Sequence, residues 1–302
     1  MPTMKFIKYI ISALLLLVSL SCTTDSTIEQ GNVSLKLTDA PMPYNQFMEA
    51  NVTIDKIEIG NSSNPNSFVT IMDSSTTYNM LDMINGITES LANTSVPVGD
   101  YDTIRLYMSS SEMITNNGES YSYNMSQNGM SGGGMMGSDM TINNENGSID
   151  ITLDHMLNVQ LGSNNEYLLD IDIEHSFMLE GVNYQNSGNG MMLSMTGFTF
   201  TPTMRFVAMN NAGTISGNVH DNQGNLAGVS ISLMQNNQTY TTTHTDQNGN
   251  YTFIGIPEGM YTINAESNDF EMSTTGNESS MGAIEMMSNG TLTIDFNMMP
   301  SN

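Results

Sequence analysis

The chain holds 31 acidic residues against six lysines and arginines among its 302 residues, which gives a formal charge of −25 at pH 7. A surface this acidic repels the phosphate backbone, so nucleic acid is excluded as a partner. Only 12% of the residues are charged. Asn, Ser, Thr and Gly supply much of the polar remainder and favour turns and short strands. We therefore expect an all-β protein whose acidic surface serves solubility or attracts cations.

Residues 1–21 have the pattern of a secretory signal. A short basic start precedes an apolar run from Ile10 to Leu20 that is too short to span a bilayer. The segment Val-Ser-Leu-Ser-Cys that ends at Cys22 resembles a bacterial lipobox, which implies cleavage before Cys22 and acylation of its thiol. Cys22 is also the single cysteine, so no internal disulfide forms. The alternative is a plain signal beside an incidental cysteine.

Residues 22–30 are polar and unpatterned and are expected to form a tether to the lipid. The protein would then be attached to a membrane of the cell envelope through lipid alone, without crossing it. The outer membrane is the expected location, and the sequence leaves the face open. Residues 22–302 keep all the acidic residues but only four basic ones, a formal charge of −27. The basic residues are Lys36, Lys56, Arg105 and Arg205.

Residues 31–208 show the apolar alternation of β-strands and are expected to form a first domain. Val33, Leu35 and Leu37 fall on one face of a first strand. A second strand over residues 51–59 changes phase at Asp55-Lys56, which predicts an irregularity there. Strands with one apolar face need a covering layer, so we expect a sandwich. Further strands are predicted at 101–108, 148–153, 167–174 and 198–207, with one short helical turn around 80–84.

Residues 116–138 are rich in Gly, Asn, Ser and Met and are expected to be a mobile insertion that is dispensable for folding. The sequence around Ser131 fits G-x-S-x-G, but a nucleophile elbow needs a strand before it and a helix after it, and this copy has neither pattern. The methionines of two clusters either bind Cu(I) or replace leucine as a pliable core filler, which is the simpler interpretation. These are Met130, Met135, Met136 and Met140, and then Met191, Met192 and Met195.

An apolar-Pro-x-Gly-x-Tyr sequence occurs twice in the chain. Proline pre-sets a turn, glycine can take a positive φ, and tyrosine opens the next strand with a ring that lies over the sheet end. Each copy predicts a corner between two strands of a sandwich. Two copies indicate either two sandwiches of related build or convergent turn chemistry. The corner residues are Pro97, Gly99 and Tyr101 in the first copy and Pro257, Gly259 and Tyr261 in the second.

The segments SLKLTDAP, NVTIDKIEI, VPVGDYDTIRL, LLDIDIEHSF and TPTMRFV follow one another between residues 31 and 208. In this order they resemble the domain of unknown function 4382 family. The insertion at 116–138 departs from the more compact connection typical of that family. Because the family has no established activity, the resemblance implies architecture and no chemistry.

The region 213–302 is expected to form a second domain. Its segments GTISGNVHDNQGNLAGVSISLMQ and TYTTTHTDQNGNYTFIGIPEGMYTINAES resemble a carboxypeptidase regulatory-like domain over about residues 213–299. The resemblance implies an Ig-like or transthyretin-like β-sandwich that is not itself catalytic and whose superfamily includes carbohydrate-binding-like folds. Apolar alternation broken by Asn-Gly and Pro-x-Gly turns favours the same architecture.

Asp170, Asp172 and Glu174 alternate with apolar residues and are predicted to line one face of the strand at 167–174. Three such carboxylates can bind Ca²⁺, although the exposed face of an amphipathic strand explains them without an ion. No other cofactor is expected. The four histidines show no metal-binding spacing, and we expect no catalytic residue.

Two functions of different class remain. The first is a lipid-anchored, non-catalytic binding or adhesion module of the cell envelope, which recognises a glycan, an envelope protein or a divalent cation through loops at the sandwich ends. The second is a structural spacer or assembly accessory of the envelope. A hydrolase ranks third, because the sequence shows no coherent set of nucleophile, base and metal ligands.

Overall fold

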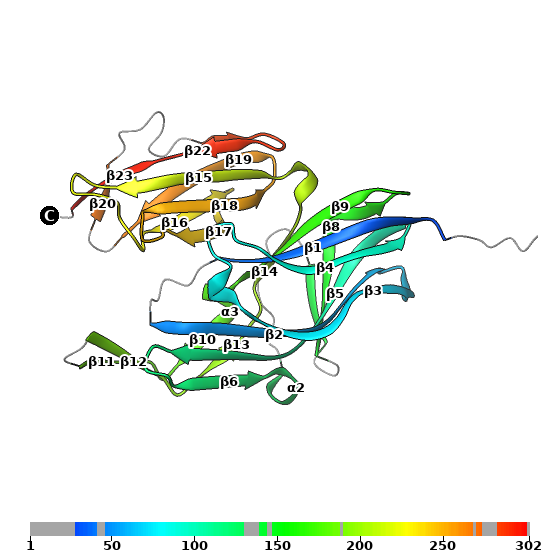
Figure 1. Cartoon of the computed structure of the whole chain (residues 1–302), viewed down its shortest axis with the longest axis horizontal. Helices are drawn as coiled ribbons and strands as arrows, with labels where there is room; N and C mark the ends of the chain where they lie inside the picture. Colours follow the sequence, from blue (N-terminus) through cyan, green and yellow to red (C-terminus); the bar gives the residue numbers. More distant parts are fainter. Residues whose placement is uncertain are drawn as a thin grey trace, which may run out of the picture.

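A computed structural model describes residues 28–40, 46–129, 139–143, 147–187, 190–267, 270–273 and 283–300. The expected all-β fold is confirmed, and the chain forms two β-sandwich domains in tandem (Figure 1). The turn η3 (Met209–Asn211) connects them. Among the described residues, no helix is long and apolar enough to cross a membrane.

The smaller sheet of the first domain has the strand order β14-β9-β1-β4. Its central strand β1 runs parallel to β9 and antiparallel to β4. Because β9 lies far along the chain from β1, this pairing brings the beginning and the later part of the domain's sequence side by side. The bounds are β1 (Gln30–Ala40), β4 (Glu89–Pro97), β9 (Asn164–Asp172) and β14 (Met204–Ala208).

The larger sheet has the order β3-β2-β5-β8-β7, and β6 also pairs with β5. The register of β2 against both neighbours shifts between Ile54 and Lys56, which confirms the irregularity predicted at Asp55-Lys56. The predicted helical turn is the 3-10 turn η2 (Met80–Asp82). The bounds are β2 (Phe47–Asn61), β3 (Asn64–Asn79), β5 (Gly99–Thr115), β6 (Ser120–Asn124), β7 (Asp139–Asn143) and β8 (Ser148–Val159).

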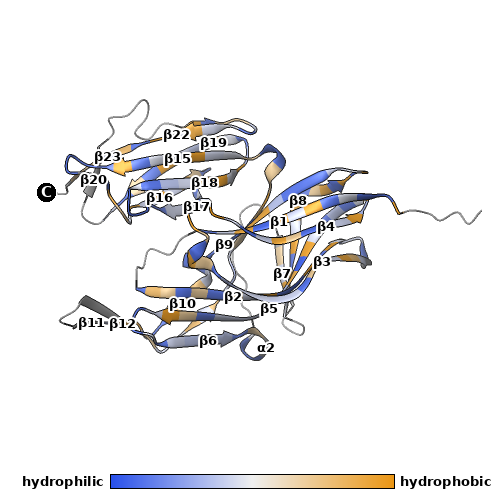
Figure 2. Cartoon of the chain, viewed as in Figure 1, coloured by the Kyte–Doolittle hydropathy of each residue, from blue (hydrophilic) through white to orange (hydrophobic). Residues whose placement is uncertain are grey.

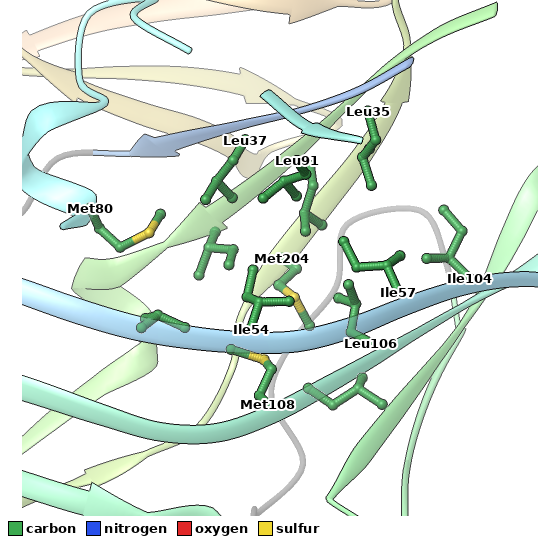
Figure 3. Close-up of a cluster of buried hydrophobic side chains, with 14 of the residues drawn as sticks. Leu35, Leu37, Ile54, Ile57, Met80, Leu91, Ile104, Leu106, Met108 and Met204 are labelled. Atoms are coloured by element: carbon green, nitrogen blue, oxygen red, sulfur yellow. The ribbon is translucent and has the colours of Figure 1, made fainter. Parts of the chain in front are cut away.

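The core of the first domain lies between these two sheets. Apolar and polar residues alternate along the strands (Figure 2), as a sheet with one covered face requires. Leu35 and Leu37 of β1 face Ile54 and Ile57 of β2 (Figure 3), and all four are at most 1% exposed. Methionines fill gaps in this core, including Met80, Met108 and Met204. Methionine therefore takes the place of leucine as a core filler at these positions.

The first half of the predicted insertion is folded, which corrects the expectation of a mobile loop. Strand β6 pairs with β5, and the short helix α2 (Met125–Asn128) follows it. Tyr123 is 9% exposed and Met125 1% exposed, and both belong to the core. Tyr121, Tyr123 and Met125 alternate with polar residues at the period of a strand, but the polar composition of the surrounding segment outweighed this short signal in the prediction. Residues 130–138, which include Ser131, lie outside the described residues.

A pair of short hairpins extends the first domain. In one, β10 (Phe177–Glu180) pairs with β13 (Gly197–Phe200), and Phe177 packs on Phe198 and Phe200 in the core. In the other, β11 (Asn183–Ser187) pairs with β12 (Gly190–Ser194). The strand predicted at 198–207 is therefore two strands, β13 and β14, separated around Pro202.

The second domain is a sandwich with its own core, which runs from Ile215 to Met298. One sheet has the order β18-β15-β23-β20, with β22 also paired to β15, and the other has the order β17-β16-β19-β21. The first comprises β15 (Gly213–His220), β18 (Asn250–Ile256), β20 (Phe270–Ser273), β22 (Thr291–Thr293) and β23 (Phe296–Pro300). The second comprises β16 (Ser230–Gln235), β17 (Gln238–His244), β19 (Gly259–Glu266) and β21 (Ile284–Met286).

The two Pro-x-Gly-x-Tyr corners form the same hydrogen bond in both domains. The hydroxyl of Tyr101 donates to the carbonyl of Pro97 at 2.8 Å. The hydroxyl of Tyr261 donates to the carbonyl of Pro257 at 3.0 Å. A tyrosine that bonds back to the backbone a few residues upstream is a known corner device of sandwiches. Both glycines take a positive φ, as expected, with 158° at Gly99 and 156° at Gly259.

Candidate functional site

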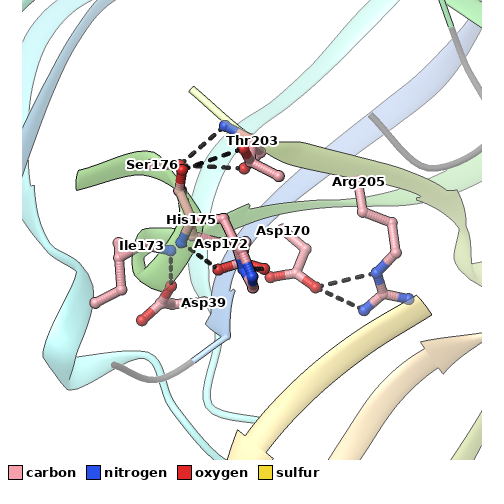
Figure 4. A network of polar contacts seen from close by, with 8 residues as sticks. All are labelled: Asp39, Asp170, Asp172, Ile173, His175, Ser176, Thr203 and Arg205. Atoms are coloured by element: carbon pink, nitrogen blue, oxygen red, sulfur yellow. Dashed lines mark hydrogen bonds and ion pairs between the residues drawn. The ribbon is translucent and has the colours of Figure 1, made fainter. Parts of the chain in front are cut away.

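A buried arginine joins the two domains. The Nε and Nη2 atoms of Arg205, on β14, donate to Oδ2 of Asp170, its direct neighbour on β9, at 3.0 and 2.7 Å (Figure 4). Nη1 donates to the carbonyl of Gly255 at 2.6 Å, and Nη2 to that of Ile254 at 3.3 Å. Both carbonyls belong to β18 of the second domain. One side chain therefore ties both sandwiches together.

The charges of this pair are set by burial and by each other. The side chains of Arg205 and Asp170 are 7% and 6% exposed. Burial by itself lowers the pKa of Arg205, but the adjacent charge of Asp170 outweighs it and raises that pKa above its usual value. Burial raises the pKa of Asp170, and the charge of Arg205 opposes that rise. The guanidinium stays charged because every contact it makes is with an acceptor or an aromatic ring.

The backbone at Gly255 is shaped for this contact. Its φ of +66° lies in the left-handed region, which favours glycine. A Cβ atom there would lie 2.7 Å from Cδ2 of Leu168, on β9 of the first domain. A larger residue would thus push the domains apart. A glycine inside the apolar strand at 251–256 is a sequence signal that could have indicated this close approach.

An Asn-Gly turn of the first domain makes a second contact between the domains. Asn85 and Gly86 both have positive φ, 56° and 79°. Oδ1 of Asn85 accepts hydrogen bonds from the hydroxyl of Thr243 at 3.1 Å and from the backbone N–H of Thr252 at 3.3 Å. A Cβ atom at Gly86 would lie 3.1 Å from Thr252 and from Ile254. The turn therefore fits closely against β17 and β18.

A cleft of about 460 Å³ opens beside the arginine, between the domains. Pockets that bind small molecules are common at domain interfaces. The first domain contributes side chains from β9, α3 (Ile173–Ser176) and β14, and the second contributes β17. The lining residues are Asp170, Asp172, His175, Thr203, Met204, Arg205, Gln238, Thr239, Tyr240 and Thr241.

The aromatic ring of the cleft is held by the arginine. The guanidinium carbon of Arg205 lies 5.0 Å from the ring centroid of Tyr240, and the Tyr240 hydroxyl lies 3.5 Å from Nη1. The ring of Tyr261 meets Tyr240 edge-on at 5.6 Å. These contacts fix the orientation of Tyr240 before any ligand arrives.

A histidine–carboxylate pair lies at the other side of the cleft. Oδ1 of Asp172 accepts a hydrogen bond from the backbone N–H of His175 at 3.0 Å, which caps the N-terminus of α3. Oδ2 of Asp172 lies 2.7 Å from Nδ1 of His175. The hydrogen bond to Asp172 raises the pKa of His175. Ser176 accepts from the backbone N–H of Thr203 at 2.9 Å, which fixes α3 against the segment that enters β14 (Figure 4).

The three carboxylates predicted to line one strand face do not do so. Strand β9 ends at Asp172, and Glu174 lies within α3. Asp170 is buried against Arg205 and Asp172 is bonded to His175, so the carboxylates have separate partners. Among the described residues, no group of three metal-binding side chains gathers. Apolar and polar residues keep alternating in the sequence beyond Asp172, but the capping hydrogen bond of Asp172 starts a short helix where the strand was predicted to continue.

Some predicted site residues lie outside the described part of the chain. Cys22 and the methionines Met130, Met135 and Met136 are among them. Met140 on β7 packs half-buried against the first core, and Met195 is 6% exposed. Sequence reasoning missed Arg205 and Tyr240 as functional residues, because the cleft that they line forms only when the domains come together.

The chain belongs to the family described as a domain of unknown function (DUF4382), whose model matches residues 30–192. The model of the carboxypeptidase regulatory-like domain matches residues 214–299. Both resemblances and their order are therefore confirmed. The first match ends before β14, so Arg205 lies between the two matched regions.

No curated protein matches the chain. Similar solved structures include the Bacillus anthracis TIE protein, at 11% identity and a TM-score of 0.24, with 96% of this chain and 61% of that chain covered. Another is BcpA, the major pilin subunit of Bacillus cereus, at 11% identity and 0.20, with 89% and 99% covered. A third is GBS52, the minor pilin of Streptococcus agalactiae, at 10% identity and 0.24, with 89% and 97% covered. The chain thus spans less than two thirds of the TIE protein's length.

Proposed function

We propose that this protein is a lipid-anchored, non-catalytic binding module of the cell envelope, and that it holds a neutral, hydroxyl-rich ligand such as a glycan in the cleft between its domains. The observation that carries the proposal is the cleft itself, which both domains build. In this proposal the second domain contacts the ligand through strand β17 and not through sandwich-end loops, because its lining residues lie on that strand.

The chemistry of the lining favours a neutral ligand. Asp170 pairs with Arg205 and Asp172 with His175, so both of these carboxylates are already engaged by side chains of the protein. A charged ligand would compete with these pairs, whereas a hydroxyl-rich ligand can use the groups that remain. Gln238 and Thr239 are exposed and can donate and accept hydrogen bonds.

The arrangement of His175 supports a binding role. A hydrolase of the triad kind needs a nucleophilic hydroxyl bonded to the free nitrogen of its histidine. Among the described residues, no serine or threonine hydroxyl bonds to Nε2 of His175. In the proposal, Nε2 serves as a hydrogen-bonding group for the ligand. The lipid anchor rests on the signal pattern and on Cys22.

A glycan array with the full chain, followed by calorimetry on the best binders, tests the proposal. The double variant Gln238→Ala/Thr239→Ala should weaken binding about tenfold, which corresponds to losing roughly 1.4 kcal/mol of hydrogen bonding. Gln223→Ala is the matched control, because Gln223 is exposed on the second domain away from the cleft lining and should leave the affinity unchanged.

Each outcome decides between the functions. Saturable binding that the double variant does not change would place the ligand elsewhere. An array and an envelope pull-down without any partner would favour the structural spacer. Turnover of a bound glycan would refute the non-catalytic role.

A further inference from the structure

Three exposed apolar side chains gather at one end of the first domain, where β1 begins. Ile28 is 68% exposed, Leu161 67% and Val98 37%. Scattered exposed apolar residues are ordinary on a soluble surface, so the grouping of these three needs a structural reason. We call this end, formed by Ile28 and by the turns at 97–99 and 160–163, the tether end.

Backbone hydrogen bonds hold the three chain segments together. The N–H of Val98 donates to the carbonyl of Glu29 at 2.9 Å, and the N–H of Gly162 donates to the carbonyl of Gln30 at 2.9 Å. The turns β4–β5 and β8–β9 thus bracket the residues just after Ile28 on both sides. The apolar group is a fixed part of the sandwich end, because β1, β4 and β9 all belong to one sheet.

The length of chain before this end places it near a membrane. Cys22 precedes Ile28 by six residues. A chain of that length spans at most roughly 20 Å. We infer that the tether end rests on the bilayer surface, with the side chains of Ile28, Val98 and Leu161 inserted at the headgroup level. This inference rests on the proposed lipid anchor.

The lipid anchor at Cys22 allows a contact of only three apolar side chains to hold the tether end on the bilayer. Three apolar side chains would hold a free protein on a membrane only weakly. A short tether turns the contact into an intramolecular event at high effective concentration. The acidic residues Glu29 and Asp100 lie exposed at the same end. They would be repelled by anionic lipid, so the surface is suited to zwitterionic headgroups.

Docking at this end would orient the whole molecule. In Figure 1, β1 begins at one extremity, and the hairpin β11–β12 lies at the opposite one. The cleft lies beside the far end of β1, because Thr38 and Ala40 pair with Asp170 and Asp172. At about 3.3 Å per residue, the eight steps from Gln30 to Thr38 hold the cleft roughly 26 Å above the bilayer.

Labelled, lipidated full-length protein in phosphatidylcholine vesicles tests the inference. Acylation of Cys22 leaves no native free thiol, so Leu161→Cys provides a single site for an environment-sensitive fluorophore. The matched control is Val182→Cys, at an exposed position beside β11 at the opposite end. Brominated phosphatidylcholine should quench the label at 161 and blue-shift its emission, and it should leave the label at 182 unchanged.

A second measurement needs no substitution at the tether end. Hydrogen exchange at 97–100 and 160–163 should slow in the vesicle-bound protein relative to the soluble Cys22→Ala chain, while exchange at 181–184 should not. Equal quenching at positions 161 and 182, or no protection of the two turns in anchored protein, would overturn the inference. Failure of the anchor is a separate result, in which the wild-type chain carries no lipid label and stays in the soluble fraction.

Discussion

Replacing Arg205 by methionine should destabilise the protein by about 3–5 kcal/mol, the range for removing one partner of a buried ion pair. The substitution keeps most of the aliphatic volume but removes the bonds to Asp170 and to the carbonyls of Ile254 and Gly255. It leaves a carboxylate that is 94% buried in the native protein without its counter-ion, and two interdomain carbonyls without their donor. The loss should appear as separate unfolding of the two domains, because the tie between them is gone.

Urea denaturation at pH 7, followed by far-UV circular dichroism, measures the effect. Arg105→Met is the matched control. Arg105 makes a two-bond ion pair with Asp150, at 2.6 Å for both bonds, but the side chains are 25% and 29% exposed. That variant should lose about 1 kcal/mol or less. Equal losses in the two variants would refute the argument that burial and position between the domains make Arg205 special.

The pH dependence of the Arg205→Met variant gives a second check. Burial raises the pKa of Asp170, and Arg205 is the neighbouring group that opposes that rise. A folded-state pKa above the unfolded value means that the folded state binds more protons, so stability is gained as the pH falls through the folded pKa. The variant should therefore recover stability as the pH falls through the raised folded-state pKa of Asp170. Adding Asp170→Leu should restore part of the loss at pH 7 and abolish the pH dependence.

Further outcomes can be measured on single variants. Tyr101→Phe and Tyr261→Phe should each lower the free energy of unfolding in urea by about 1 kcal/mol, since each corner loses a hydrogen bond from the hydroxyl to a proline carbonyl. Tyr184→Phe, at a 49% exposed position, should leave the free energy of unfolding unchanged. Met125→Ala should cost about 2–5 kcal/mol; a loss below 1 kcal/mol would restore the loop interpretation. NMR titration should give His175 a pKa above its usual value. The stabilisation from its ion pair should be complete below the unfolded-state pKa and should vanish as the pH rises through the folded-state pKa. An unshifted pKa would contradict the contact with Asp172.

The strands and corners of both domains could be predicted because their signals are local. Val33, Leu35 and Leu37 alternate within five residues, and all three are at most 1% exposed. The phase change at Asp55-Lys56 marks the register shift for the same reason. Each corner tyrosine bonds to a proline only four residues upstream.

Two predictions from local patterns were wrong, and the contacts in the structure explain why. The segment at 120–128 looks polar, yet β6 finds a place beside β5 and carries Met125 into the core. The alternation through Glu174 looks like a continuing strand, yet the side chain of Asp172 bonds the backbone of His175 and starts a helical turn.

The sequence by itself determined that the chain is all-β, where its strands alternate, how its two corners close and which families it resembles, since these properties depend on residues a few positions apart. The tertiary structure alone decided the cleft. Arg205 lies 35 residues from Asp170, which it meets when the first sandwich forms, and 50 residues from Gly255, which it meets only after the two sandwiches have docked. Periodicity describes one strand at a time, and it carries no information on which strand of another domain will face it.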